Sequence, residues 1–134
     1  MEGHSADIVM SFNECINRRD LGGLSRLMTD DHVFVDSANN TISGKERCIE
    51  AWRGFFAAFP DYRNHFEFVA LSGRRAVIAG CSVCSDARLA GPALWTAKIE
   101  GQLIAEWRVY EDTSANRALL GLKVGLPVCL QRIV

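Results

Sequence analysis

The chain lacks the charge, apolar length and repeats that mark several common classes of protein. Its 134 residues carry a net charge of −1, without the basic stripe that nucleic-acid binding needs. No apolar run is long enough to span a bilayer, and the N-terminus shows no basic-then-apolar signal pattern. No repeat, low-complexity tract or linker interrupts it. We therefore expect a single domain over residues 1–134, with its core at about 5–127 and a C-terminal arm at 113–134.

The usual signatures of metal, redox and phosphate chemistry are missing as well. The five cysteines are scattered, which predicts reduced thiols in a cytoplasmic protein. Cys81 and Cys84 lie three residues apart in an expected strand, so they point to opposite faces and cannot share an ion. His32 and His65 stand at expected strand starts and are predicted to be surface residues. No glycine-rich phosphate loop or nucleophile elbow occurs, and we expect neither a metal nor a cofactor.

Helices are predicted in the first half of the chain. Apolar residues recur at helical spacing over residues 5–18, and Asp20 can cap a second, short helix. Ser43 and Glu46 form a capping-box pattern at the start of a third helix, which Pro60 ends.

Strands are predicted mostly in the second half, with tight turns at Gly73 and Gly101. The expected strands are residues 32–36, 62–72, 74–86, 93–100 and 103–111. Helices followed by a run of antiparallel strands are typical of an α+β domain, in which a curved sheet carries its helices on one face. The segment from Thr113 onward is expected to be a short helix or an extended arm.

This order of elements, with particular residues at its joints, resembles the nuclear transport factor two-like superfamily. Within it, the chain is most similar to the SnoaL-like polyketide cyclases and the ketosteroid isomerases. The resemblance covers roughly Met10 to Pro127. The stretches that carry it are NRRDLGGLSRLMTDDHVFVD, GKERCIEAWRGFFAAFPD, GQLIAEWRVYED and ALLGLKVGLP.

The resemblance implies a cone, in which a strongly bent antiparallel sheet wraps around three helices and leaves an apolar pocket open at one end. Such pockets commonly bind small molecules, and we expect a small apolar organic ligand. Aromatic residues at these spacings can equally be simple core. The residues predicted to line the pocket are Phe12, Phe34, Trp52, Phe56, Trp95 and Trp107.

Asp36 is the first candidate catalytic residue. It matches the position of the general-base aspartate of the ketosteroid isomerases, directly after the first strand. An acid at the mouth of an apolar cone is expected to have a raised pKa, which suits proton abstraction next to a carbonyl group. The alternative is that Asp36 is an Asx-turn residue that ends the strand before SANN.

The helper residues of both relatives are missing. The isomerase oxyanion donors would fall on Phe12 and near Trp95, where the sequence has no tyrosine and no acid, which disfavours steroid isomerisation by that arrangement. Asp112 matches the late acid of the cyclases, but no histidine stands near Ala97 to assist it. Asp112 could equally cap a final helix.

Two functions remain open at this stage. One is a cofactor-independent isomerase, cyclase or dehydratase that uses Asp36 or Asp112. The other is a non-catalytic ligand-binding or protein-association domain. In both cases we expect a homodimer formed through the open face of the sheet, where apolar side chains would otherwise meet water. The candidate contacts are Val77, Ala79, Ile104 and Tyr110.

Overall fold

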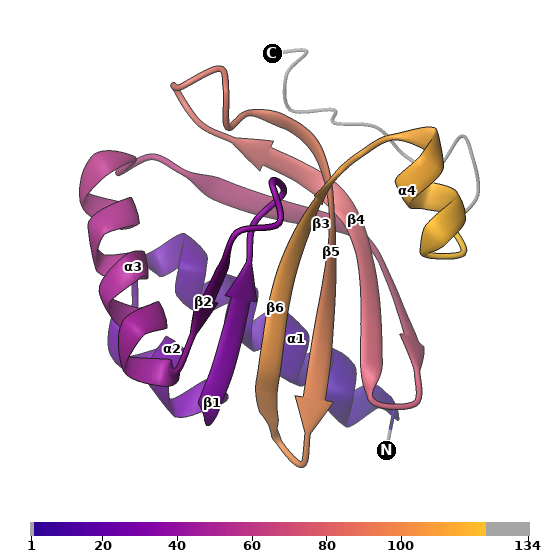
Figure 1. The fold of residues 1–134 in the computed structure, drawn as a ribbon, viewed down its shortest axis with the longest axis horizontal. Helices are drawn as coiled ribbons and strands as arrows, with labels where there is room; N and C mark the ends of the chain where they lie inside the picture. The colour runs from indigo at the N-terminus through magenta and orange to yellow at the C-terminus, as the bar shows by residue number, and fades with distance from the viewer. Residues whose placement is uncertain (1, 123–134) are drawn as a thin grey trace.

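The computed structural model describes residues 2–122 of the chain, and of residues 2–4 only the backbone (Figure 1). The helices are α1 (Glu2–Arg18), α2 (Leu21–Leu27), α3 (Lys45–Ala58) and α4 (Ser114–Leu119). The strands are β1 (Met28–Val35), β2 (Thr41–Ser43), β3 (Arg63–Ser72), β4 (Arg75–Val83), β5 (Gly91–Glu100) and β6 (Leu103–Glu111).

The six strands form one sheet in the order β2-β1-β6-β5-β4-β3, and α1, α2 and α3 pack on one of its faces. The predicted α+β class with a curved sheet is confirmed. The sheet is mixed, however, because β1 and β6 pair in parallel while every other pair is antiparallel. Antiparallel neighbours here are joined by short connections, whereas half of the chain separates β1 from β6, so no hairpin dictates their relative direction.

Bulges bend the sheet around its helices. The register of β3 against β4 shifts between Phe66 and Phe68, and that of β5 against β6 shifts between Lys98 and Ile99. At the first of these bulges Gly80 faces the main chain of β3, where an added Cβ would collide with the carbonyl oxygen of His65. A glycine is therefore required where the two backbones approach most closely.

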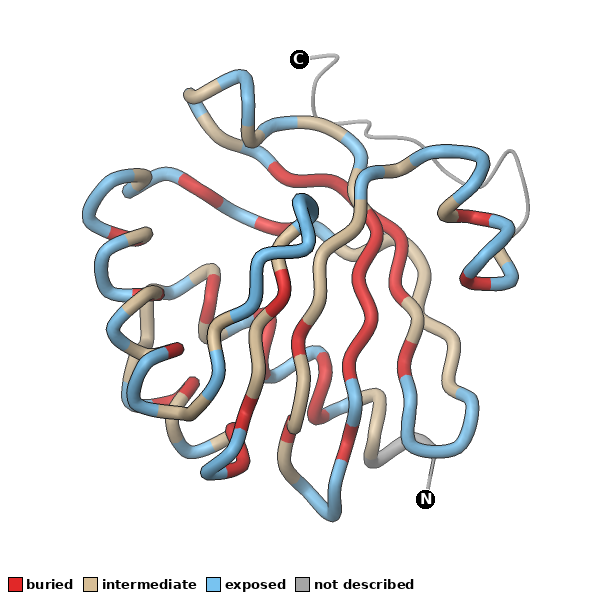
Figure 2. Tube along the Cα trace, in the orientation of Figure 1, coloured by how far each residue is buried: buried red, intermediate tan, exposed pale blue. Residues whose placement is uncertain are grey.

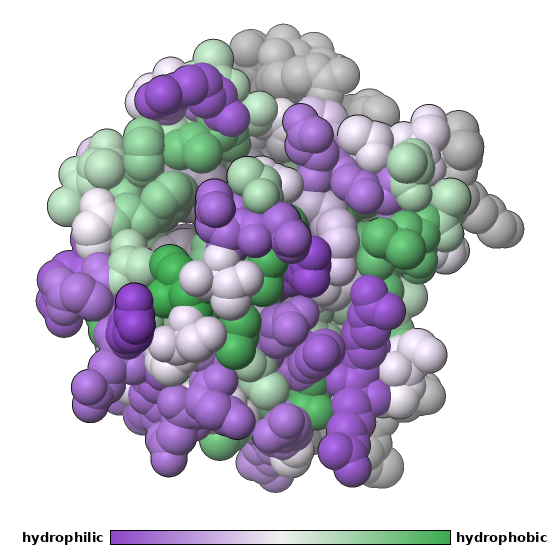
Figure 3. Space-filling model, viewed as in Figure 1, coloured by the Kyte–Doolittle hydropathy of each residue, from purple (hydrophilic) through white to green (hydrophobic). Residues whose placement is uncertain are grey.

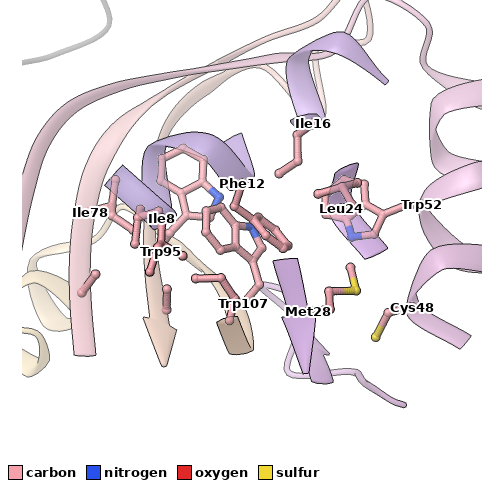
Figure 4. Close-up of a cluster of buried hydrophobic side chains, with 14 of the residues drawn as sticks. Ile8, Phe12, Ile16, Leu24, Met28, Cys48, Trp52, Ile78, Trp95 and Trp107 are labelled. Atoms are coloured by element: carbon pink, nitrogen blue, oxygen red, sulfur yellow. The ribbon is translucent and has the colours of Figure 1, made fainter. Parts of the chain in front are cut away.

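The core lies between α1 and the concave face of the sheet (Figure 2). Phe12 of α1 is fully buried, and its ring centroid lies 4.4 Å from that of Trp107 on β6 (Figure 4). Trp95 on β5 is also fully buried, and its ring centroid is 4.9 Å from that of Phe66. These large aromatic side chains hold the first helix against the strands at the far end of the chain.

Of the two predicted helix caps, the one at the start of α2 is confirmed and the one at the start of α3 is wrong. The predicted cap by Asp20 is confirmed, since its side chain accepts a hydrogen bond from Gly23 N at 2.9 Å. The predicted capping box of Ser43 and Glu46 is wrong. Gly44 is the N-cap of α3 and makes no side-chain cap bond, because Ser43 is already the last residue of β2.

The first strand is longer than predicted and has a partner that the sequence did not indicate. It begins at Met28 rather than at residue 32, and the polar stretch after it forms β2 in antiparallel pairing with β1. The prediction that His32 lies on the surface is also wrong. His32 is fully buried, because it shares the concave face of β1 with Phe34 and its ring stacks on Phe12.

The outer face of the sheet is largely polar and is partly covered by α4. Figure 3 shows hydrophilic side chains over much of this face, with apolar ones gathered near α4. Lys98 and Glu106 form an ion pair there at 3.6 Å. The apolar residues of this face form a small cluster around Leu120, which follows α4 directly. Its buried members are Ala79, Leu94 and Leu120, with Val77 and Tyr110 packed against them.

This arrangement corrects one of the four predicted dimer contacts. Ile104 is fully buried in the main core rather than on the open face, because the register shift near Ile99 turns its side chain inward. Val77, Ala79 and Tyr110 do lie on the outer face. The arm predicted from residue 113 contains the short helix α4. Its residues 123–134 lie outside the described part of the chain.

The cysteines are not uniform in state. Cys15, Cys48 and Cys84 are free, whereas Cys81 is disulfide-bonded, so the prediction of reduced thiols does not hold for Cys81.

Within residues 2–122, no helix combines the length and the hydropathy needed to cross a bilayer.

Candidate functional site

A cavity of about 390 Å³ lies between α3, β1 and the concave face of the sheet. It lies where the cone opens, beside the loop that joins β1 to β2. Its walls are mostly apolar, and polar groups occur at the mouth and on one side. The residues that line it are Phe34, Asp36, Ser37, Ala38, Ile42, Cys48, Ala51, Trp52, Phe55, Tyr62, Asn64, Leu89, Trp95, Trp107 and Val109.

Four of the six aromatic residues predicted for the pocket line this cavity. Phe34 and Trp52 pack edge to face in its wall, with ring centroids 5.7 Å apart. Trp95 and Trp107, neighbours on β5 and β6, form its inner wall. Phe12 is core rather than lining, since it is fully buried and its ring packs directly against that of Trp107.

Phe56, the sixth predicted aromatic, also belongs to the core, and Phe55 lines the cavity in its place. Phe55 packs edge to face against both Trp52 and Tyr62, with interplanar angles of 87° in each case. Phe55 lies one residue from the apolar stripe of α3, so a search for helical periodicity assigns it to the wrong face. The rotation of α3 against β1 decides which of the two phenylalanines meets the cavity.

Asp36 lines the cavity at its mouth, two residues after Phe34 and just beyond the end of β1. Its Oδ1 accepts hydrogen bonds from Ala38 N at 2.9 Å and Asn40 N at 2.8 Å, and its Oδ2 accepts one from Asn40 Nδ2 at 3.1 Å. Partial burial pushes the pKa of Asp36 upward, but these hydrogen bonds outweigh it, so the pKa lies below its ordinary value. The prediction of a raised pKa is therefore wrong, and the Asx-turn alternative describes the local geometry.

Asp112 lies outside the cavity lining, just beyond the end of β6. Its carboxylate holds the guanidinium of Arg117 by two hydrogen bonds of 2.6 and 2.8 Å. The cap of α4 is Thr113, whose side chain accepts a hydrogen bond from Asn116 N at 3.0 Å. The ion pair of Asp112 with Arg117 therefore links the end of β6 to α4.

A buried polar network forms one side of the cavity, and the sequence analysis had overlooked it. Asn64 is 2% exposed, and its Oδ1 accepts a hydrogen bond from Ser82 Oγ at 2.8 Å. The hydroxyl of Tyr62 lies 3.3 Å from Ser82 Oγ. Burial raises the pKa of Tyr62, so its hydroxyl keeps its proton. The signal in the sequence was an asparagine inside an otherwise apolar strand, which is unusual unless its hydrogen bonds are met.

Three hydrogen-bond donors in the cavity wall have no partner among the described residues. They are Asn64 Nδ2, Trp95 Nε1 and Trp107 Nε1. Buried donors are nearly always paired, by protein, water or ligand. No group of three or more histidine, cysteine or acidic side chains within residues 2–122 is placed to hold a metal ion. The residues that line this cavity therefore combine aromatic walls with buried hydrogen-bond donors that lack a partner among the described residues.

The sequence matches a known protein family over most of its length. Residues 9–113 match the family of the SnoaL-like domain. The chain belongs to the SnoaL-like family. No curated protein sequence matches it significantly.

Solved structures of SnoaL-like proteins share the fold across nearly their whole length. A Shewanella denitrificans protein assigned as a SnoaL-like polyketide cyclase is 17% identical with a TM-score of 0.73, covering 87% of this chain and 96% of that chain. IdmH from Streptomyces antibioticus, assigned as a polyketide cyclase, is 17% identical with a TM-score of 0.69, covering 88% and 99%. At such identities the likeness establishes the fold and leaves the activity to the site.

A third structure shows that the fold extends to the ketosteroid isomerase type. It is a Catenulispora acidiphila protein with a ketosteroid isomerase-like fold, in complex with trimethylamine. It is 18% identical with a TM-score of 0.67, covering 90% of this chain and 96% of that chain. The expected membership of the SnoaL-like branch is confirmed by the family match over residues 9–113, and these structures show that the fold is shared.

Proposed function

We propose that this SnoaL-like protein binds a small, mostly apolar organic molecule in its conical cavity, without a cofactor. The observation that carries the proposal is the cavity itself, about 390 Å³ in volume and walled by Phe34, Trp52, Phe55, Trp95 and Trp107. Its volume falls within the usual range of small-molecule sites, roughly 300–1,000 Å³. Aromatic walls with a few convergent polar groups are the common composition of such sites.

A cavity-filling substitution tests this proposal. The probe is N-phenyl-1-naphthylamine, an uncharged dye whose fluorescence rises when it enters an apolar site. Ala51 of α3 lines the cavity, and Ala51→Phe would fill part of it. Ala57 lies on the same helix but is exposed, so Ala57→Phe makes the same change outside the cavity.

The wild type and Ala57→Phe should bind the dye with similar affinity, and Ala51→Phe should bind it at least about tenfold more weakly. Thermal unfolding of both variants shows that each is folded. If the wild type does not bind the dye, or if both variants bind it as well as the wild type does, the cavity is not the binding site.

Proton transfer by Asp36 is a second candidate function. The observation in its favour is that Asp36 is the carboxylate among the residues that line the cavity, and its lowered pKa keeps it ionised at neutral pH. The three hydrogen bonds that it accepts from Ala38 and Asn40, however, stabilise its ionised form and make it a weak proton acceptor. We therefore place ligand binding first and keep isomerisation, cyclisation or dehydration as the reaction class for Asp36. The proposal leaves Asp112 outside the site.

A homodimer completes the proposal. The free thiols of Cys15, Cys48 and Cys84 support a cytoplasmic location, whereas the disulfide at Cys81 does not. Of the outer-face candidates for a dimer contact, Ala79 is buried, so Val77 and Tyr110 remain. Leu119 of α4 is also exposed. Light scattering at micromolar concentration should give twice the chain mass of 14.8 kDa. A mass of a single chain would contradict the dimer and leave the ligand proposal untouched.

A further inference from the structure

The main chain of Asn64 is fixed where β3 begins. Its N–H donates to Asn17 Oδ1 at 2.8 Å, and Asn17 Nδ2 donates back to its carbonyl oxygen at 2.9 Å. Asn13 Nδ2 donates to the same carbonyl oxygen at 3.2 Å. Two asparagines of α1 therefore hold the backbone of this one residue, so that its side chain starts from a fixed point in the cavity wall.

The side-chain amide of Asn64 is oriented by a chain of hydroxyl groups. Ser82 Oγ has a single proton, which it donates to Asn64 Oδ1. Tyr62 must then be the donor in its 3.3 Å contact with Ser82 Oγ. This relay from Tyr62 through Ser82 holds the amide oxygen of Asn64 toward Ser82. The amide NH₂ is left without a partner among the described residues.

The unpaired polar groups of the cavity wall are all donors. Besides Asn64 Nδ2 they are the indole N–H groups of Trp95 and Trp107, which belong to fully buried side chains on neighbouring strands (Figure 4). Other buried polar atoms without a partner also occur in residues 2–122, but they belong to residues outside the cavity lining. Those residues are Asn13, Thr29, His32 and Glu67.

We infer that Asn64 is the specificity-determining residue of this pocket and that its amide donates a hydrogen bond to an acceptor oxygen of the ligand. Tyr62 and Ser82 act as positioning residues. A ligand without an acceptor would leave buried donors unpaired, which is more unfavourable than the loss of one hydrogen bond in water. The inference rests on the ligand-binding function proposed above and adds that the pocket discriminates by an oxygen on an apolar frame.

The test compares two planar molecules of nearly the same shape, 9-fluorenone and fluorene, which differ in one carbonyl oxygen. Their affinities are measured by quenching of tryptophan fluorescence. The wild type should bind fluorenone about tenfold or more tightly than fluorene, the lower part of the range expected for a buried donor that gains its acceptor. The ratio of the two affinities is the readout, because changes in pocket shape affect both compounds.

Variants assign that ratio to the relay. Asn64→Leu removes the donor, and Ser82→Ala frees the amide to rotate, so both should bring the ratio close to one. Ser82→Thr keeps the hydroxyl and should preserve the ratio. Trp52→Phe serves as the control, because Trp52 lines the same cavity but its N–H is not among the unpaired buried donors of the described residues.

The outcomes separate the inference from the proposed function. Equal binding of fluorenone and fluorene by the wild type would overturn the role of Asn64 and leave the apolar pocket standing. A ratio that Asn64→Leu and Ser82→Ala leave unchanged would also overturn it. Binding of neither compound would contradict the proposed function, and the inference with it. If Asn64→Leu does not fold, the comparison of Ser82→Ala with Ser82→Thr decides.

Discussion

The Nδ1 atom of His32 lies 2.7 Å from the carbonyl oxygen of Ile104, although 72 residues separate the two along the chain. Since a carbonyl oxygen only accepts, Nδ1 carries the proton and Nε2 is the bare nitrogen. The bond joins the first long strand to the last one, in the parallel pair β1–β6. The bond lies beside Phe12 in the core, because the ring of Phe12 stacks on that of His32.

His32 should make the protein less stable in mild acid. Burial lowers the pKa of His32 by more than the bond to Ile104 raises it, so the unfolded chain takes up a proton more readily than the folded one does. The stability that His32 contributes is therefore complete above its unfolded pKa of about 6.5 and is lost progressively as the pH falls below that value. Urea unfolding between pH 7.5 and 5.5 should show this loss.

The His32→Asn variant keeps a donor near the position of Nδ1 and cannot titrate. Its free energy of unfolding should change less over this pH range than that of the wild type, by up to about 1 kcal/mol per pH unit. The exposed His65 provides the control, and His65→Asn should keep the pH dependence of the wild type. Equal pH dependence of all three proteins would show that His32 does not cause the acid loss.

Asp36 should titrate at a lower pH than an ordinary aspartate. The hydrogen bonds from Asn40 and Ala38 outweigh the effect of partial burial on its pKa. The stability that it contributes is present above the unfolded pKa of about 4 and is lost as the pH falls through the folded pKa. NMR titration of the carboxyl carbon measures the value directly. Asn40→Ala removes one donor and should raise the pKa of Asp36. A pKa above the ordinary value in the wild type would restore Asp36 as a candidate general acid or base.

Gly80 should not tolerate a side chain. Its Cβ would meet the carbonyl oxygen of His65, so Gly80→Ala must separate β3 from β4 at the bulge and should lower the free energy of unfolding by about 1–3 kcal/mol. Gly54 of α3 has no atom within 4 Å of an added Cβ, and Gly54→Ala should be neutral or stabilising, by up to about 1 kcal/mol. Denaturant unfolding of both variants tests this contrast, and equal effects would contradict it.

Asp112 should act on the stability of α4. Both partners of its ion pair with Arg117 are largely buried, with side chains 14% and 10% exposed. Asp112→Asn should therefore speed hydrogen exchange in α4 and lower stability by about 1–3 kcal/mol. Asp86 pairs with Arg88 at the surface, and Asp86→Asn should change stability by less than about 1 kcal/mol. Unchanged exchange in α4 would show that the pair with Arg117 does not hold it.

Local chemistry in the sequence determined most of the elements. The limits of β6 agree with the prediction, the stop of α3 before Pro60 is confirmed, and Asp20 caps α2 as its side-chain type suggests. These features depend on residues close together in the chain. Phe34 and Asp36 both line the cavity, in keeping with the fixed period of two that puts alternate strand residues on one face.

Only the tertiary structure decided which residues form the site. The burial of His32, the lining by Phe55 in place of Phe56, and the inward turn of Ile104 all depend on how α3 and a bulge are placed against the sheet. The orientation of the Asn64 amide depends on Ser82, from a neighbouring strand. Such contacts join segments far apart in sequence, and no local pattern records them. The sequence therefore determined the elements and the curved α+β fold, while packing decided which polar residues line the cavity.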